Sequence, residues 1–193
     1  MSQLSAYHLR RPRLTSRLLG ASASPNASVI VGGGGYGKSA LAAEAAELLD
    51  VPVISTALES AGVSAALLPH RLRSAAARVG LSDLAALMDR AASAGPAGVL
   101  DALLEALAGS GVMIVVDEVQ HAQPEALALL TRLAGQLGAD QRLLLIGRAA
   151  PAAAFEPRFT SGKHKGQCNA NANPLAKGAV ATFLAAGVLT VNG

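Results

Sequence analysis

Aromatic residues and cysteines are scarce in this sequence. Only 3% of its 193 residues are aromatic, and tryptophan is absent. Alanine, leucine and valine must therefore fill the core, which suits helices and buried parallel strands better than an aromatic-rich antiparallel sandwich. The single cysteine, Cys168, excludes an internal disulfide framework and is compatible with a reducing compartment. A chain of this length suits one domain with appendages.

Long apolar runs are also missing. The N-terminus is polar and basic, so we expect no signal peptide. The uncharged segment 178–191 is shorter than the roughly 20 residues that a membrane helix needs. We therefore expect a soluble, cytoplasmic protein without a membrane partner.

Acidic residues are absent from the first 20 residues, which carry four arginines and a local charge of +4. Residues 21–149 hold 8 basic and 12 acidic residues, so the high isoelectric point says little about the globular part. The arginine-rich arm contacts phosphates such as those of DNA, is solvated, or docks onto its own core. We divide the chain into this arm with a connector (1–27), a core (28–151) and an irregular polar tail (152–193).

One glycine-rich stretch, SVIVGGGGYGKS at residues 28–39, matches the P-loop pattern G-x-x-x-x-G-K-[ST]. The alternative is a flexible glycine linker. A linker would not need a strand pattern before it and a helix pattern after it, and this stretch has both. Glycines allow positive φ and let backbone N–H groups approach a polyphosphate. The residues predicted to bind the nucleotide are Gly32, Gly33, Gly34, Gly35, Tyr36, Gly37, Lys38, Ser39 and Ala40.

The residues around this stretch alternate between strand and helix patterns. We expect strands at 29–31, 52–58, 112–116 and 142–147, with helices at 38–49, 82–94, 97–108 and from 123 to about 138. Pro69 and the Gly95-Pro96 pair are expected to interrupt helices, and Ser82 is a candidate N-cap. For 175–191 we expect a helix followed by a terminal strand. The alternation predicts an α/β fold of three layers with a mostly parallel sheet.

An acidic pair, Asp117 and Glu118, follows the apolar run 112–116 and is expected at the edge of the sheet where ligands collect. Asp117 would hold Mg²⁺ opposite Ser39, and Glu118 would activate the water that attacks the γ-phosphate. Arg148, after the next strand, would reach the γ-phosphate. The plainer alternative for each is an ordinary surface charge. His121 and Gln123 suit either water positioning or helix capping.

No N-K-x-D segment occurs, so the guanine-reading signature of GTPases is missing and adenine is the better prediction. We expect ATP with Mg²⁺, with Lys38, Glu118 and Arg148 as the catalytic residues.

Three segments carry a family resemblance: GGGGYGKSALA, VMIVVDEVQHAQPEALALLTRLA and RLLLIGRAAP. They resemble the ATPase domains of STAND-class signal-transducing regulators, and most nearly the maltose-regulator-like, large LuxR-type transcriptional activators. HLRRPRLTSRLL also resembles the segment that precedes the P-loop in those proteins. The resemblance implies a P-loop NTPase of the ASCE type, in which another strand separates the Walker B strand from the P-loop strand.

The resemblance also implies that Lys38 and Ser39 contact phosphate and Mg²⁺, that Asp117 and Glu118 form the Walker B pair, and that Arg148 senses the γ-phosphate. It covers residues 8 to 151 and departs from the pattern where a fifth strand should follow the arginine. We therefore expect a truncated ATPase module, or one whose sequence after about residue 154 has left the family pattern. We expect it to switch with nucleotide and to pair with a protein partner or with itself. The alternatives are an AAA-type ATPase assisting a DNA transaction, a non-hydrolysing interaction module and a small-molecule kinase.

Overall fold

The computed structural model describes residues 10–19, 26–59 and 62–148, and the backbone of three short strands at 157–158, 180–183 and 187–190. Cys168 lies outside these residues. Within them, no helix is both long and apolar enough to cross a membrane.

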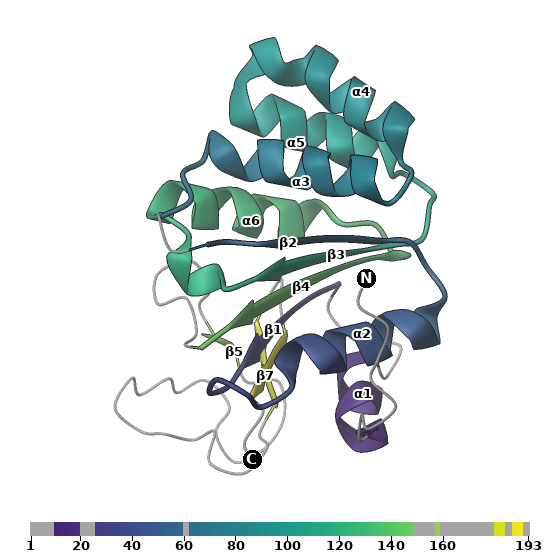
Figure 1. Ribbon diagram of the computed structural model, residues 1–193, viewed down its shortest axis with the longest axis vertical. Helices are drawn as coiled ribbons and strands as arrows, with labels where there is room; N and C mark the ends of the chain where they lie inside the picture. Colours follow the sequence, from purple (N-terminus) through teal and green to yellow (C-terminus); the bar gives the residue numbers. More distant parts are fainter. Residues whose placement is uncertain are drawn as a thin grey trace.

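A parallel sheet of four strands forms the centre of the molecule (Figure 1). These strands, in their order across the sheet, are β2 (Val53–Ala57), β3 (Val112–Asp117), β4 (Gln141–Gly147) and β1 (Ala27–Val31). β4 therefore separates β1, which leads into the glycine-rich loop, from β3, which carries the acidic pair. This order confirms the topology predicted from the sequence. All four carboxyl ends meet at one edge of the sheet.

Helices cover both faces of this sheet, which gives the three predicted layers (Figure 1). On one side of the sheet lie α3 (Leu67–Arg78), α5 (Gly95–Ala106) and α6 (Pro124–Gln136), and α4 (Ser82–Arg90) packs on α3 and α5, farther from the sheet. The other face carries α1 (Pro12–Leu19) and α2 (Lys38–Leu49). The described residues also form two short 3-10 helices, η1 (Ala91–Ala94) and η2 (Val119–His121).

The apolar run of β3 is continuous because both faces of this strand are buried. Val112, Ile114 and Val116 pack into the cluster under α3 to α6, whereas Met113 and Val115 pack into the cluster under α1 and α2. Successive side chains of a strand point to opposite faces, so a strand between two helical layers needs apolar residues at every position. This packing holds Asp117 at the end of a rigid element.

The position beside β1 is taken by β7 (Gly187–Thr190), which pairs with β1 in parallel. β6 (Val180–Phe183) pairs antiparallel with β7, and β5 (Pro157–Arg158) pairs with β6. The terminal strand was predicted, but the helix expected before it is wrong at 180–183, where β-branched and aromatic residues favour a strand. The missing fifth strand is thus supplied by residues much later in the chain than expected.

Three expectations about the central helices are wrong. Pro69 does not interrupt a helix; it lies in the first turn of α3, where the missing N–H has no intrahelical acceptor to lose. Ser82 is the first residue of α4 and Leu81 holds the N-cap position, so Ser82 is not the cap. The predicted break at Gly95-Pro96 is confirmed, because Gly95 ends η1 with φ 74° and Pro96 lies in the first turn of α5. Residues 91–94 form η1 instead of continuing α4.

The basic N-terminal segment docks onto α2. Leu18 is buried against this helix, and the Thr15 hydroxyl donates to the Glu44 carboxylate at 2.9 Å. Glu44 is a charged residue of α2, yet it is 2% exposed because the start of α1 covers it. Of the three alternatives for the arginine-rich arm, docking onto its own core is therefore the one seen for the described residues 10–19.

Candidate functional site

The glycine-rich loop connects the end of β1 at Val31 to the start of α2 at Lys38. Gly35 has φ 78° and Gly37 has φ 70°, the left-handed region that glycine enters without cost. An added Cβ at Gly34 or Gly35 would meet only open space, so the outer side of the loop is free for a ligand. The loop thus presents backbone N–H groups and the N-terminus of α2 to an accessible surface.

Lys38 lies under this loop rather than in solvent. Its side chain is buried, and its ammonium donates to the backbone carbonyl of Gly33 at 2.9 Å. A lysine that is held against the loop by one carbonyl bond keeps two further donors for an anion. This placement fits the predicted role of Lys38 in phosphate binding.

Ser39 and Asp117 meet at the edge where β3 ends. The Ser39 hydroxyl donates to Asp117 Oδ2 at 2.7 Å across a sequence separation of 78. The other oxygen, Oδ1, accepts from the backbone N–H of Glu118 at 2.7 Å. The two residues predicted to share a metal ion are therefore direct neighbours in the fold.

Glu118 has a left-handed backbone, with φ 55° and ψ 40°. A non-glycine residue in this region costs about 1–3 kcal/mol and persists only where surrounding contacts impose it. Glu118 is the residue between the end of β3 and the start of η2, so its left-handed backbone turns the chain out of the strand direction. Such outliers cluster at functional sites.

Three side chains converge on one oxygen of Glu118. Gln120 Nε2 donates to Oε2, Arg148 Nε lies 3.6 Å from the same atom, and His121 Nε2 lies 3.8 Å from it. Gln120 Oε1 in turn accepts from the backbone N–H of Arg148 at 3.1 Å. The tips of β3 and β4 are thereby joined through one amide side chain.

The structure brings most of the predicted residues to one edge. Gly32 donates to the Gly147 carbonyl at 3.3 Å, which sets the loop beside the end of β4 and thus near Arg148. Tyr36 is 42% exposed and its ring packs against Gly33. Gln123 is placed apart: it is the N-cap residue of α6, where its side chain makes no capping bond and lies next to Gly62.

Two contributions were not foreseen from the sequence. Gln120 was not predicted to belong to the site, although its amide lies only two positions after Glu118 in the sequence. Arg11 donates to the Tyr36 carbonyl at 2.8 Å and approaches Gly37. Nothing local in the sequence indicates this second contact, because the two residues meet only when α1 docks.

The residues present fit Mg²⁺. Hydroxyl and carboxylate oxygens are the hard ligands that this ion prefers, and it is usually held by one or two protein groups together with waters and substrate phosphates. Ser39 and Asp117 supply such a pair with their oxygens already adjacent. Within 10–19, 26–59 and 62–148, no group of three or more His, Cys, Asp or Glu residues forms an all-protein metal cage.

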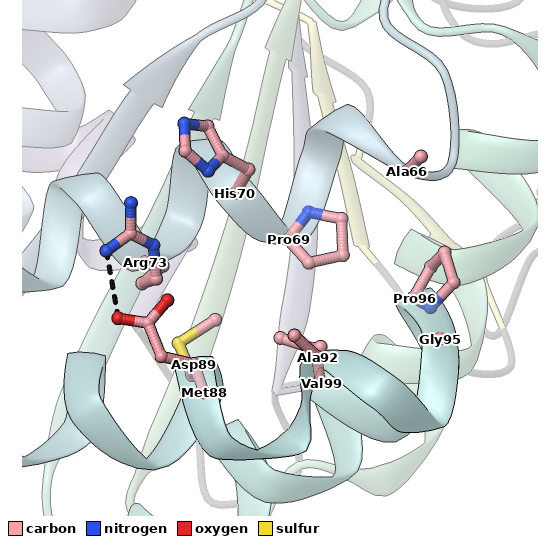
Figure 2. Close-up of a pocket in the computed structure, with 10 residues that line it drawn as sticks. All are labelled: Ala66, Pro69, His70, Arg73, Met88, Asp89, Ala92, Gly95, Pro96 and Val99. Carbon is pink, nitrogen blue, oxygen red and sulfur yellow. Dashed lines mark hydrogen bonds and ion pairs between the residues drawn. The ribbon is translucent and has the colours of Figure 1, made fainter.

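One cavity lies beside this edge of the sheet, and another lies away from it. One of about 530 Å³ has Ser39 and Asp117 in its wall and extends between α2 and the end of α3, but none of the loop glycines lines it. The glycine-rich loop therefore does not belong to this cavity, and its residues Gly33, Gly34 and Gly35 are exposed. A second cavity of about 210 Å³ lies among α3, α4 and α5, with the Arg73–Asp89 ion pair in its wall (Figure 2). It shares no residue with the predicted site.

Comparison with known proteins relates the chain to ATPase domains. A family model described as an AAA ATPase domain matches residues 11–146. Comparison with curated proteins found no match.

Two of the solved structures to which the chain is similar are the following. A STAND protein of Pyrococcus horikoshii with a tetratricopeptide repeat sensor has TM-score 0.52 and 19% identity, over 78% of this chain and 22% of that chain. A Walker-type ATPase of Pyrococcus abyssi has TM-score 0.49 and 17% identity, over 73% of this chain and 45% of that chain. The chain thus spans less than half the length of either. At this identity the first likeness shows the fold alone, and it agrees with the predicted α/β P-loop NTPase.

Proposed function

Because the chain belongs to the AAA ATPase domain family, we propose that it binds ATP together with Mg²⁺ at the glycine-rich loop and hydrolyses ATP slowly. The observation that carries this proposal is the contact between Ser39 Oγ and Asp117 Oδ2 at 2.7 Å, directly after the buried Lys38. Ser39 lies at the start of α2 and Asp117 at the end of β3, and a shared cation would account for the adjacency of their oxygens.

Each residue has a role that follows from its position. The loop N–H groups and the Lys38 ammonium bind the phosphates, while Ser39 and Asp117 hold the metal ion. When bound, Mg²⁺ neutralises charge on the β- and γ-phosphates. Glu118 accepts a proton from the attacking water, whose oxygen bonds to the γ-phosphorus as the bond to the bridging oxygen breaks and ADP leaves. Arg148 stabilises charge on the γ-phosphate.

Slow turnover is expected because the cradle is open. Efficient phosphoryl transfer needs water excluded and the reacting groups aligned, which a second domain or partner normally provides by closing over the nucleotide. We further propose that ATP binding acts as a signalling switch of a cytoplasmic transcriptional regulator. The support for this finer role is the resemblance of the loop, Walker B and post-strand arginine segments to large LuxR-type activators.

Two of the described N-terminal arginines make contacts within the chain, which does not favour the DNA-transaction alternative. Arg11 donates to the Tyr36 carbonyl, and Arg10 lies 3.4 Å from Glu47 in an exposed ion pair. Arg13 is exposed and stays available to a phosphate.

An ATP titration with and without Mg²⁺, read with phosphate release, tests the proposal. Lys38→Ala should abolish ATP binding, because the buried ammonium is lost from the cradle. Glu118→Gln should preserve binding and reduce hydrolysis by about 10²–10⁴-fold, the usual contribution of a general base. Glu125→Gln, an exposed glutamate in the first turn of α6, is the matched control and should behave like the wild type. Equal ATP affinity in wild type and Lys38→Ala would reject the site.

A further inference from the structure

Gln120 stands between two residues that the hydrolytic step needs. Its Nε2 donates to Glu118 Oε2, and its Oε1 accepts from the backbone N–H of Arg148 at 3.1 Å. We infer that Gln120 is a positioning residue that fixes the Glu118 carboxylate and the tip of β4 relative to each other for attack on the γ-phosphate. This inference rests on the proposed ATP hydrolysis.

A primary amide of this length can make both bonds. A carboxamide carries a donor and an acceptor on one rigid plane, whereas a carboxylate lacks the donor and an ammonium lacks the acceptor. The two partners also settle which way the amide points. The Arg148 N–H needs the oxygen and the Glu118 carboxylate needs the nitrogen, so the reversed amide would lose both bonds.

The backbone beneath Gln120 is well supported. Val119 is fully buried, and His121 N–H donates to the Glu118 carbonyl at 3.0 Å. The His121 carbonyl accepts from Val63 N–H at 2.8 Å, which ties η2 to the segment after β2. A side chain carried by such a turn holds its partner in place better than one carried by a free loop.

The contacts leave one oxygen of Glu118 available. Within the part of the chain that the structure describes, the contacts from Gln120, Arg148 and His121 all reach Oε2 and none reaches Oε1. A carboxylate anchored through one oxygen can present the other to water in a defined direction. The ion pair with Arg148 cannot replace this anchor, because the arginine side chain is 66% exposed and exposed pairs contribute little.

Loss of the anchor should therefore affect chemistry more than binding. A displacement of about 1 Å in a reacting group can lower a rate about 10²-fold without touching the groups that bind the substrate. Gln120 contacts neither the glycine-rich loop nor Ser39 among the described residues, so ATP affinity should remain.

The test compares Gln120→Met, which keeps the shape and loses both hydrogen bonds, with the exposed control Gln136→Met. Single-turnover phosphate release and ATP affinity are measured for each variant. Gln120→Met should reduce the rate by about tenfold or more with KM and ATP affinity within about twofold, and the control should match wild type. Gln120→Asn keeps the amide but is one methylene too short, so it should lose the same activity. It replaces Gln120→Met as the test if that variant folds poorly.

A double variant separates positioning from general damage. In the Glu118→Gln background, Gln120→Met should cause no further loss, because Gln120 acts through the carboxylate that is already gone. An additive loss, a parallel fall in ATP affinity, or unchanged turnover in Gln120→Met would each overturn the inference.

The inference and the proposed function fail differently. A wild-type chain that binds ATP and releases no phosphate over hours would overturn the role of Gln120 and leave nucleotide binding standing. A wild-type chain that does not bind ATP would overturn the proposed function first, and the inference with it.

Discussion

The guanidinium of Arg11 donates to the backbone carbonyl of Tyr36 at 2.8 Å, which ties the start of α1 to the glycine-rich loop. The same residue uses its backbone N–H to contact Glu44 of α2 at 3.1 Å. Arg11 therefore contacts the glycine-rich loop and α2 at the same time. Because of this, the docking of the N-terminal segment on α2 helps to hold the conformation of the loop.

Arg11→Ala should weaken ATP binding by a few-fold, because the loop loses a charge-assisted hydrogen bond of about 1.5 kcal/mol or more at Tyr36. Isothermal titration with ATP and Mg²⁺ would measure this. Arg13→Ala, two residues on and exposed, is the control that should leave the affinity unchanged. Equal affinities in both variants would show that docking of α1 does not reach the nucleotide.

Glu44→Ala should lower the free energy of unfolding by about 1–3 kcal/mol, because the Arg11 N–H and the Thr15 hydroxyl lose a buried acceptor. Glu47→Ala, one turn further along α2, removes only an exposed ion pair and should change stability by less than about 0.5 kcal/mol. Urea unfolding of both variants gives the comparison. A Glu44 variant as stable as the Glu47 variant would contradict the docked helix.

Ser39→Ala should raise the Mg²⁺ concentration needed for ATP binding by about tenfold, because one oxygen ligand of the metal ion is lost. ATP titrations at several Mg²⁺ concentrations measure the shift, and binding without metal should be nearly the same as in wild type. Ser110→Ala is the control, since Ser110 is exposed just before β3, at the opposite edge of the sheet. An unchanged Mg²⁺ requirement would remove Ser39 from the metal site.

Asp50→Gly should raise the free energy of unfolding by about 0.5–1 kcal/mol. Asp50 ends α2 with φ 50° and is exposed, so a side chain there carries left-handed strain that glycine relieves. Asp50→Ala keeps the strain and should not stabilise. Thermal unfolding of the two variants distinguishes them, and equal melting temperatures would argue against a left-handed cap.

Much of the site was predictable because its residue types repeat a local pattern. A β-prone run, glycines and Gly37-Lys38-Ser39 before a helix specify a loop conformation that neighbouring residues largely impose. Five apolar residues before Asp117 likewise predict a strand buried on both faces, and the order of strands and helices predicts that the carboxyl ends share an edge.

Long-range contacts were the part that could not be predicted. Glu44 is polar and looks like a surface residue of α2, but α1 covers it. The terminal strand was predicted, but its pairing with β1 and the pairing of residues 180–183 with it were not, because local residue preferences do not indicate which distant strand is the partner. Pro69 shows the same limit on a smaller scale, because whether proline breaks or begins a helix depends on where the helix starts.

The sequence by itself determined the α/β class, the strand and helix that flank the glycine-rich loop, and the residues that we propose for phosphate and metal, because these depend on spacing along a few consecutive residues. Only the tertiary structure decided that Ser39 meets Asp117, that Gln120 joins Glu118 to Arg148, and that α1 braces the loop. Hydrogen bonds between separate elements exist only after the sheet and helices have packed, since packing brings donor and acceptor within about 3 Å.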